Sequence, residues 1–308
     1  MVLTPDAAAF LRLLEADAKI TAEWSVEQIR ERSRADAIAA EDRIGLDDVR
    51  DVDAAGVPCR LYVPTDPVDR PVSGLVLHLH GGGFVLNDVE VHDAACRRLA
   101  FRSGHAVLSV DYRRPPEHRF PAAPDDVDTV LAWLAAEGPA RGLDVPVVAH
   151  GDSAGANLAL VAALRHPGRF AAAVLIYPFL DPTGSFPSFR RETHGFDPRA
   201  AAWFWEQYAT SPADLGDPDL APLLSEHLAT LPPTLVLTAE HDPLVDEGEH
   251  LAVLLTEAGV KVTATRYLGM LHGFWRHPTV FDAATTATQQ VAAFVAHHLP
   301  ATHPSPEA

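Results

Sequence analysis

Short apolar runs alternate with helix-like segments through most of this 308-residue chain, and this alternation limits the folds open to it. Runs such as GLVLHLH are almost continuously apolar, which is typical of central parallel strands covered on both faces. The strand candidates are residues 56–63, 74–80, 106–112, 145–150, 171–177, 233–239 and 261–268. The helix candidates are residues 91–104, 124–138, the run after Ser153, 247–259 and 281–299. This order predicts an α/β fold with a doubly covered, mostly parallel sheet.

Two segments interrupt the alternation, residues 1–45 and residues 184–231. The second contains a helical pattern rich in aromatic residues, namely Trp203, Phe204, Trp205 and Tyr208. An insertion of this kind between two core strands predicts a lid over a site. The same rings would also serve to pack the insertion onto the core, and the sequence leaves open which of them face a pocket.

The acidic composition of the chain narrows its expected partners. Acidic residues outnumber basic residues 42 to 24, so the net charge is -18, the wrong sign for binding nucleic acid. No apolar run reaches the roughly 20 residues of a membrane span, and we expect no stable membrane association. The N-terminal segment lacks a basic n-region and the chain has 2 cysteines, which together predict a cytoplasmic protein with reduced thiols.

The stretch GDSAG at residues 151–155 places Ser153 between two glycines, after an apolar strand and before an apolar helix. A nucleophilic serine at a sharp strand-to-helix turn suits this pattern, because the glycines let the strand and the helix approach closely. Serine is also a common residue at the start of a helix. The pentapeptide alone does not separate a nucleophile from a helix cap.

A serine nucleophile needs a base, and the base needs an orienting group. Asp242 follows the strand candidate at residues 233–239, and His272 follows the next one. Both are therefore expected at the carboxyl edge of the sheet, where the catalytic loops of such folds gather. Taken singly, Asp242 is a turn residue and His272 a loop histidine, while Asp246 is the better candidate to cap the helix that follows.

Three consecutive glycines, Gly81 to Gly83, follow the strand candidate at residues 74–80. Because such a run costs conformational entropy, we infer that the backbone there must be free of side chains. The N–H groups of Gly82 and Gly83, with that of Ala154, are predicted to form an oxyanion hole. A phosphate-binding loop is the alternative, but the segment lacks G-x-G-x-x-G spacing and the P-loop lysine.

Five motifs together resemble the hormone-sensitive-lipase-like esterases, bacterial family IV of the α/β-hydrolase superfamily. They are HGGGF, VDYRRPPEHRFPAAPDDV, GDSAGANLA, AEHDPLVDEG and HGF. The resemblance covers about residues 55–300 and departs at Arg114, Pro115, His150 and Ala156, none of which removes a catalytic group. It implies an α/β-hydrolase fold with an eight-stranded, mostly parallel sheet, flanking helices and a helical cap. The implied parts are the N-terminal part of the cap at 1–45, the core at 46–183 and 232–308, and the cap insertion at 184–231.

The same resemblance implies roles for single residues. The family's catalytic triad falls on Ser153, Asp242 and His272, and its oxyanion-hole amides on Gly82, Gly83 and Ala154. The residues expected to line the substrate pocket are Phe84, Asp152, Trp203 and Phe204. No cofactor and no metal is expected, and the habit of the family favours a homodimer.

The predicted activity is hydrolysis of short- to medium-chain acyl esters through an acyl-enzyme. One alternative is an amidase or arylformamidase, which would use the same triad and glycine motif. Another is a non-catalytic ligand-binding protein on this fold, similar to the plant gibberellin receptors. Those receptors lack the catalytic histidine, whereas this chain has His272 at the matching position.

Overall fold

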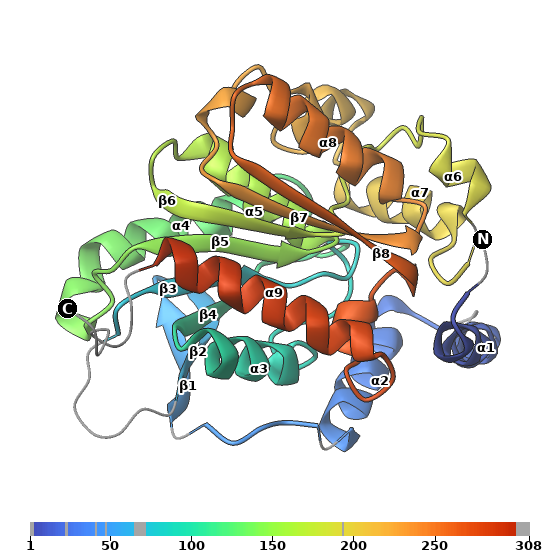
Figure 1. Cartoon of the computed structure of the whole chain (residues 1–308), viewed down its shortest axis with the longest axis horizontal. Helices are drawn as coiled ribbons and strands as arrows, with labels where there is room; N and C mark the ends of the chain where they lie inside the picture. The colour runs from blue at the N-terminus through green and yellow to red at the C-terminus, as the bar shows by residue number, and fades with distance from the viewer. Residues whose placement is uncertain are drawn as a thin grey trace.

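An eight-stranded sheet forms the middle layer of the molecule (Figure 1). The computed structural model describes residues 3–21, 24–40, 42–46, 48–64, 72–192 and 194–299, and the tail from residue 300 lies outside them. The strand order is β1-β2-β4-β3-β5-β6-β7-β8, with β2 antiparallel to both of its neighbours and the other pairs parallel. The strands are β1 Asp48–Ala54, β2 Val57–Val63, β3 Leu75–Leu79, β4 Ala106–Val110, β5 Val147–Asp152, β6 Phe170–Ile176, β7 Thr234–His241 and β8 Val262–Leu271. The predicted mostly parallel sheet of eight strands is confirmed.

One strand, β1, is absent from the strand candidates of the sequence analysis. Its sequence DVRDVDA carries charged residues at four of seven positions, so it lacks the apolar run that marks the central strands. It forms the outer strand of a hairpin with β2, in which Ala54 pairs with Val57. Its two valines, Val49 and Val52, are half-buried and pack against the hydrophobic clusters on opposite faces of the sheet.

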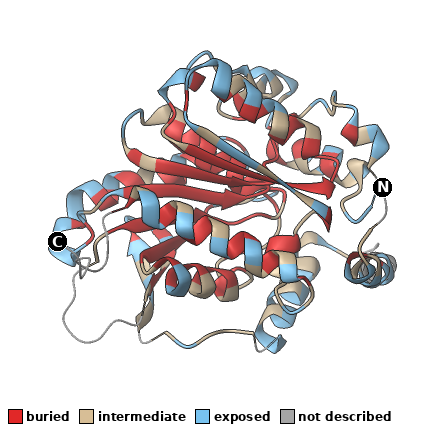
Figure 2. Cartoon of the chain, in the orientation of Figure 1, coloured by how far each residue is buried: buried red, intermediate tan, exposed pale blue. Residues whose placement is uncertain are grey.

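Helices cover both faces of the sheet (Figure 1). On one face α3 and α9 pack together, and on the other α4, α5 and α8 lie against the strands. The core helices are α3 Asp93–Ser103, α4 Ala122–Glu137, α5 Ala154–Arg165, α8 Val245–Glu257 and α9 Asp282–His298. Figure 2 shows that the central strands are buried along most of their length, whereas most of these helices are buried only towards the sheet. None of the helices in the described part of the chain is long and apolar enough to cross a membrane.

The two segments outside the strand–helix alternation form helices beyond the carboxyl ends of the parallel strands (Figure 1). The first contains α1 Pro5–Thr21 and α2 Val26–Ala39, and the second contains α6 Ser188–Arg191 and α7 Pro198–Tyr208. Short 3-10 turns complete the described chain: η1 Pro139–Arg141, η2 Pro212–Gly216, η3 Pro222–Leu224, η4 Leu228–Thr230 and η5 Phe274–Arg276. This placement agrees with a cap over the site, although the division at residues 45, 183 and 231 stays a prediction.

Specific contacts hold the outlying helices on the core. Arg30 of α2 donates to the Val85 carbonyl at 2.8 Å and pairs with Glu117 at 2.9 Å, so α2 is tied to the chain that follows the glycine loop. Helix α7 begins with Pro198 after Asp197, whose side chain caps the Arg199 N–H. The positions of α7 that are buried follow a helical period and comprise Ala201, Trp205 and Tyr208.

Candidate active site

Ser153 occupies the turn between β5 and α5. Its backbone has φ 55° and ψ -121°, a positive φ that a residue with a Cβ adopts only under strain. Its N–H donates to the Ile176 carbonyl at 2.8 Å, which fixes the turn against β6. The side chain makes no capping hydrogen bond to α5. Ser153 therefore stands at the start of a helix without serving as its cap.

The hydroxyl of Ser153 meets His272 instead. Ser153 Oγ lies 3.0 Å from His272 Nε2, and His272 Nδ1 lies 2.6 Å from Asp242 Oδ2. Because a carboxylate only accepts, Nδ1 carries the ring proton and Nε2 is left to accept the hydroxyl proton of Ser153. Asp242 is fully buried, and its other oxygen accepts from the Leu244 N–H at 2.9 Å. The structure thus joins the three predicted residues in one chain of hydrogen bonds.

The sheet positions Asp242 and His272, because the first directly follows β7 and the second directly follows β8. The expectation that Asp246 caps α8 is wrong: the N-cap position is Leu244, and no side chain caps the helix there. Asp246 lies within the first turn, where it accepts from the Ser188 N–H at 2.9 Å and pairs with Arg191 at 3.1 Å. It fastens α6 to the core.

The glycine loop, residues 81–83, follows β3, which pairs with β5 in the sheet. Gly82 and Gly83 have φ values of +126° and +58°, which explains why this turn uses glycine. The loop closes on itself through the Leu86 N–H, which donates to the Gly82 carbonyl at 2.8 Å. Within the described residues the N–H groups of Gly82, Gly83 and Ala154 donate to no protein acceptor. They are therefore available to an oxyanion.

Asp152 lies behind this loop. One carboxylate oxygen accepts from the Gly81 N–H at 2.9 Å and lies 3.1 Å from His92 Nε2. Although burial opposes ionisation, the electrostatic attraction and the hydrogen bond of His92, followed by the charge of Arg276, hold the pKa of Asp152 well below its ordinary value. These contacts assign Asp152 to holding the glycine loop, in place of the substrate contact expected from the sequence.

Aromatic rings of the cap insertion (residues 184–231) cover the front of the site. The ring of Phe204 lies over Gly83, since a Cβ built on that glycine would come within 2.3 Å of the ring. Phe196 stacks on His272 with ring centroids 4.6 Å apart, and it lies 6.2 Å from Phe204. Of the predicted pocket residues, Phe204 is thus placed beside the site.

The other two aromatic residues of that prediction each pack against a ring of α7. Phe84 is fully buried and stacks on Tyr208 at 3.8 Å, so it links the glycine loop to α7. Trp203 is one-third exposed and meets the edge of Phe204 at 5.2 Å. Phe84 therefore acts through packing, and Trp203 stands at the outer side of Phe204.

Sequence reasoning missed two rings that contact His272. Tyr177, just after β6, lies 4.6 Å from the imidazole on one side, and Phe196 lies at the same distance in a stacked arrangement. Tyr177 ends a strand candidate and Phe196 lies inside the cap insertion, so the sequence position of each residue indicated that it lies near the site. Neither position indicated a contact with the imidazole, because that depends on how the insertion folds back over the sheet.

This arrangement can perform acyl transfer. A serine hydroxyl hydrogen-bonded to an oriented imidazole is an activated nucleophile, and nearby unpaired N–H groups suit the oxygen of a tetrahedral intermediate.

Comparison with known proteins identifies the family. Residues 76–276 match the family model described as alpha/beta hydrolase fold. The chain is 35% identical to the ethyl acetate hydrolase of Pseudomonas putida, across 97% of this chain and 100% of that protein. It is 35% identical to carboxylesterase NlhH of Mycobacterium tuberculosis, across 80% of this chain and 79% of that one.

Solved structures agree. The hyperthermophilic esterase from the archaeon Pyrobaculum calidifontis superimposes with a TM-score of 0.87 at 36% identity, covering 96% of this chain and 99% of that chain. The chain belongs to the hormone-sensitive-lipase-like esterases of the alpha/beta hydrolase fold.

Proposed function

We propose that this chain hydrolyses carboxylic esters of short- to medium-chain acids through an acyl-enzyme. The observation that carries the proposal is the hydrogen-bonded series from Ser153 through His272 to Asp242, at 3.0 and 2.6 Å. Ala154, whose N–H is a predicted oxyanion-hole donor, directly follows the nucleophile in the chain. The names of the relatives, an ethyl acetate hydrolase and a carboxylesterase, support an ester as substrate over an amide.

In the first half of the reaction, Ser153 Oγ attacks the acyl carbon while His272 Nε2 takes the hydroxyl proton. The carbonyl oxygen becomes an oxyanion, to which Gly82, Gly83 and Ala154 donate N–H groups. Each such donor is worth about 3 kcal/mol in the transition state by comparison with measured donors. The imidazolium then gives its proton to the leaving alcohol as the C–O bond breaks.

In the second half, water attacks the acyl-enzyme and gives a proton to His272, and the serine leaves with that proton restored. Asp242 keeps the imidazole in one orientation and stabilises its charged form throughout. Because the carboxylate is fully buried, it has no competing bond to bulk water. No cofactor enters any of these steps.

The proposal is tested with p-nitrophenyl esters from acetate to palmitate beside amide substrates, including N-formylkynurenine. We expect the highest kcat/KM among the short and medium esters. Higher kcat/KM for the amides would favour the amidase or arylformamidase alternative. Ligand binding without turnover, together with failure of a phosphonate to label Ser153, would favour the non-catalytic alternative.

Phe204 is expected to limit the length of the acyl or alcohol group, because its ring lies directly over Gly83. Replacing Phe204 with Ala opens that space. We expect the ratio of kcat/KM for p-nitrophenyl octanoate over butyrate to rise about tenfold, equivalent to about 1.4 kcal/mol of selectivity. Trp203→Ala is the matched control on the outer side of the same helix turn, and its ratio should stay within about twofold of wild type. Equal ratios in the two variants would show that Phe204 does not set chain length.

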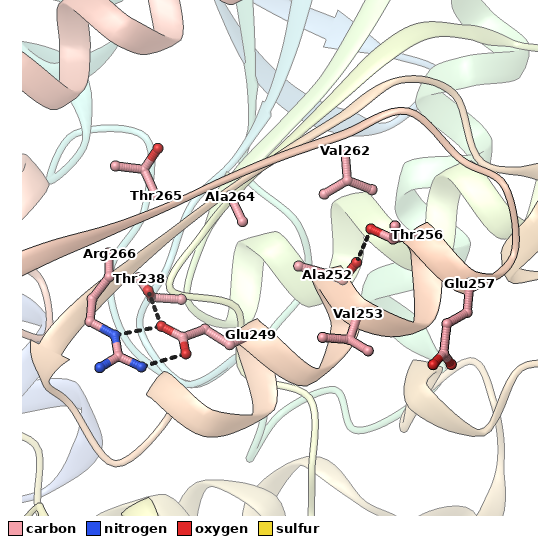
Figure 3. Close-up of a pocket in the computed structure, with 10 residues that line it drawn as sticks. All are labelled: Thr238, Glu249, Ala252, Val253, Thr256, Glu257, Val262, Ala264, Thr265 and Arg266. Carbon is pink, nitrogen blue, oxygen red and sulfur yellow. Dashed lines mark hydrogen bonds and ion pairs between the residues drawn. The ribbon is translucent and has the colours of Figure 1, made fainter.

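We further propose that the protein is a homodimer formed through the β8 edge of the sheet. β8 is the last strand of the sheet, and Leu268 on it is 69% exposed. A hollow of about 510 Å³ lies beside it, between α8 and β8, and Val253 lines it (Figure 3). Unpaired edge strands with exposed apolar side chains favour association.

The cytoplasmic location also stays a prediction from the sequence.

Sedimentation velocity tests the dimer. Wild-type protein at micromolar concentration is expected to sediment as a dimer, and Leu268→Lys as a monomer, because a buried unpaired ammonium opposes association. Leu224→Lys, at an exposed leucine of the cap insertion, is the control and should leave the dimer intact. A monomeric wild-type protein would refute the proposal.

A further inference from the structure

A cluster of buried histidines lies behind the site and takes no part in the mechanism above. His78 on β3 and His150 on β5 are register partners on adjacent strands, with their Nδ1 atoms 2.9 Å apart. The ring of His92, just before α3, lies 5.4 Å from that of His78, and its Nε2 lies 3.1 Å from Asp152 Oδ1. All four side chains have no exposed surface or almost none.

We propose that His78, His92 and Asp152 bind one divalent cation of the Zn²⁺ class. One ligand atom from each of the three lies within 4.8 Å of the others. Two imidazoles and one carboxylate form a donor set that suits Zn²⁺ and neighbouring transition metals. No metal was expected from the sequence, in which these three ligands lie 14 and 60 residues apart.

The hydrogen bond between His92 and Asp152 already has the dimensions of two neighbouring metal ligands. Ligands about 2.0–2.1 Å from a metal lie roughly 2.8–3.4 Å apart, the lower value in octahedral and the upper in tetrahedral geometry. The His92 Nε2 and Asp152 Oδ1 atoms are 3.1 Å apart. A proton on Nε2 bridges them at present, because the carboxylate can only accept. On cation binding this proton moves to Nδ1 of His92, which makes no hydrogen bond among the described residues, and the ion then binds both atoms.

His78 supplies the third ligand through a nitrogen that lacks a partner. Its Nδ1 faces His150, while its Nε2 is buried and makes no hydrogen bond among the described residues. When the Nδ1–H of His78 donates a hydrogen bond to His150 Nδ1, the Nε2 of His78 keeps a free lone pair that can bind a cation. A metal-binding histidine usually donates the N–H of its other ring nitrogen to a fixed acceptor, and His150 Nδ1 provides that acceptor here.

Charge favours the same ligand set. His78 and His92 are fully buried, and burial favours the neutral imidazole, which is the form that coordinates a metal. Burying a carboxylate is costly, and the direct partners of Asp152 are His92, the Gly81 N–H and, at 3.5 Å, the Tyr177 hydroxyl. A bound cation would neutralise it.

The cation would have a structural role. Neither Ser153 nor His272 belongs to the cluster, and closing the ligand atoms from 4.8 Å to a bonding arrangement requires small rotations of the buried rings. Because Asp152 also accepts from Gly81, the ion would tie β3, β5 and the start of α3 to the glycine loop. Binding should therefore raise the melting temperature without altering the ester-hydrolysis mechanism.

Metal content tests the proposal directly on the full chain. Chelator-treated protein is mixed with Zn²⁺ or Co²⁺ and desalted, and the retained metal is measured by plasma mass spectrometry. We expect one ion per chain, a rise in Tm of at least about 4 °C, and X-ray absorption of the Zn²⁺ form showing scattering from two imidazoles. No retained metal, or a bound ion without imidazole scattering, would overturn the proposal. This readout on wild-type protein stands even if a variant does not fold.

Variants locate the ion. His78→Gln and Asp152→Asn should each lose the retained metal and the Tm shift, whereas His166→Gln should keep both. His166 bonds to Asp128 at the surface and serves as the matched histidine control. Equal metal content in all three variants would place the ion elsewhere and refute the site. Ser153→Ala should bind metal like wild type, so the result does not depend on the proposed esterase activity.

Discussion

Ser153→Ala is expected to lower kcat for p-nitrophenyl butyrate by at least about 10⁴-fold, comparable to the loss of a nucleophile in other serine hydrolases. The hydroxyl is the atom that forms the acyl-enzyme, and His272 Nε2 at 3.0 Å would be left with no proton to accept. The side chain makes no capping bond to α5, so its removal should leave the melting temperature within about 2 °C of wild type.

Two controls make this result specific. Ser225→Ala removes a hydroxyl that bonds only to a local loop N–H, and it should retain wild-type kcat. A fluorescent phosphonate should label wild type and Ser225→Ala but not Ser153→Ala. Near-wild-type hydrolysis by a folded Ser153→Ala variant would refute the acyl-enzyme mechanism.

The fold was predictable to the extent that burial leaves a pattern in the sequence. β3 and β5 are buried at every position, and their apolar runs are visible without a structure. β1 lacks that signal because it lies at the edge of the sheet and carries charged residues at four of its seven positions. The order of the strands, with β3 between β4 and β5, was not predicted, because apolar runs do not reveal which strands lie side by side.

The candidate site divides in the same way. Ser153, Asp242 and His272 could be named because each lies just after a strand, and parallel strands end at one edge of the sheet. The stacking of Phe196 on His272 could not be predicted, because it depends on the path of the cap insertion. Asp152 shows a further limit, since its sequence position beside the nucleophile does not reveal that its side chain turns away.

The second large effect concerns Gly155. Replacing it with Ala should lower the free energy of unfolding by about 3 kcal/mol or more, or prevent folding altogether. A Cβ at this position would lie 2.0 Å from the Leu79 carbonyl oxygen and 2.7 Å from the His80 carbonyl carbon. These are backbone atoms of β3 and the glycine loop, so no rotamer change can relieve the overlap. In a helix without this contact, alanine would be more stable than glycine by about 1 kcal/mol. Any loss of unfolding free energy therefore reports the overlap of the added Cβ with the backbone of Leu79 and His80.

Gly216→Ala is the control, because a Cβ there meets no heavy atom within 4 Å. Denaturant unfolding should place this control within about 0.5 kcal/mol of wild type. If Gly155→Ala folds, it should also lose activity, since moving α5 away from β3 separates the Ala154 N–H from those of Gly82 and Gly83. A Gly155→Ala variant as stable and as active as the control would contradict this account. The close approach of α5 to β3 would then not be what sets the spacing between the nucleophile and the glycine loop.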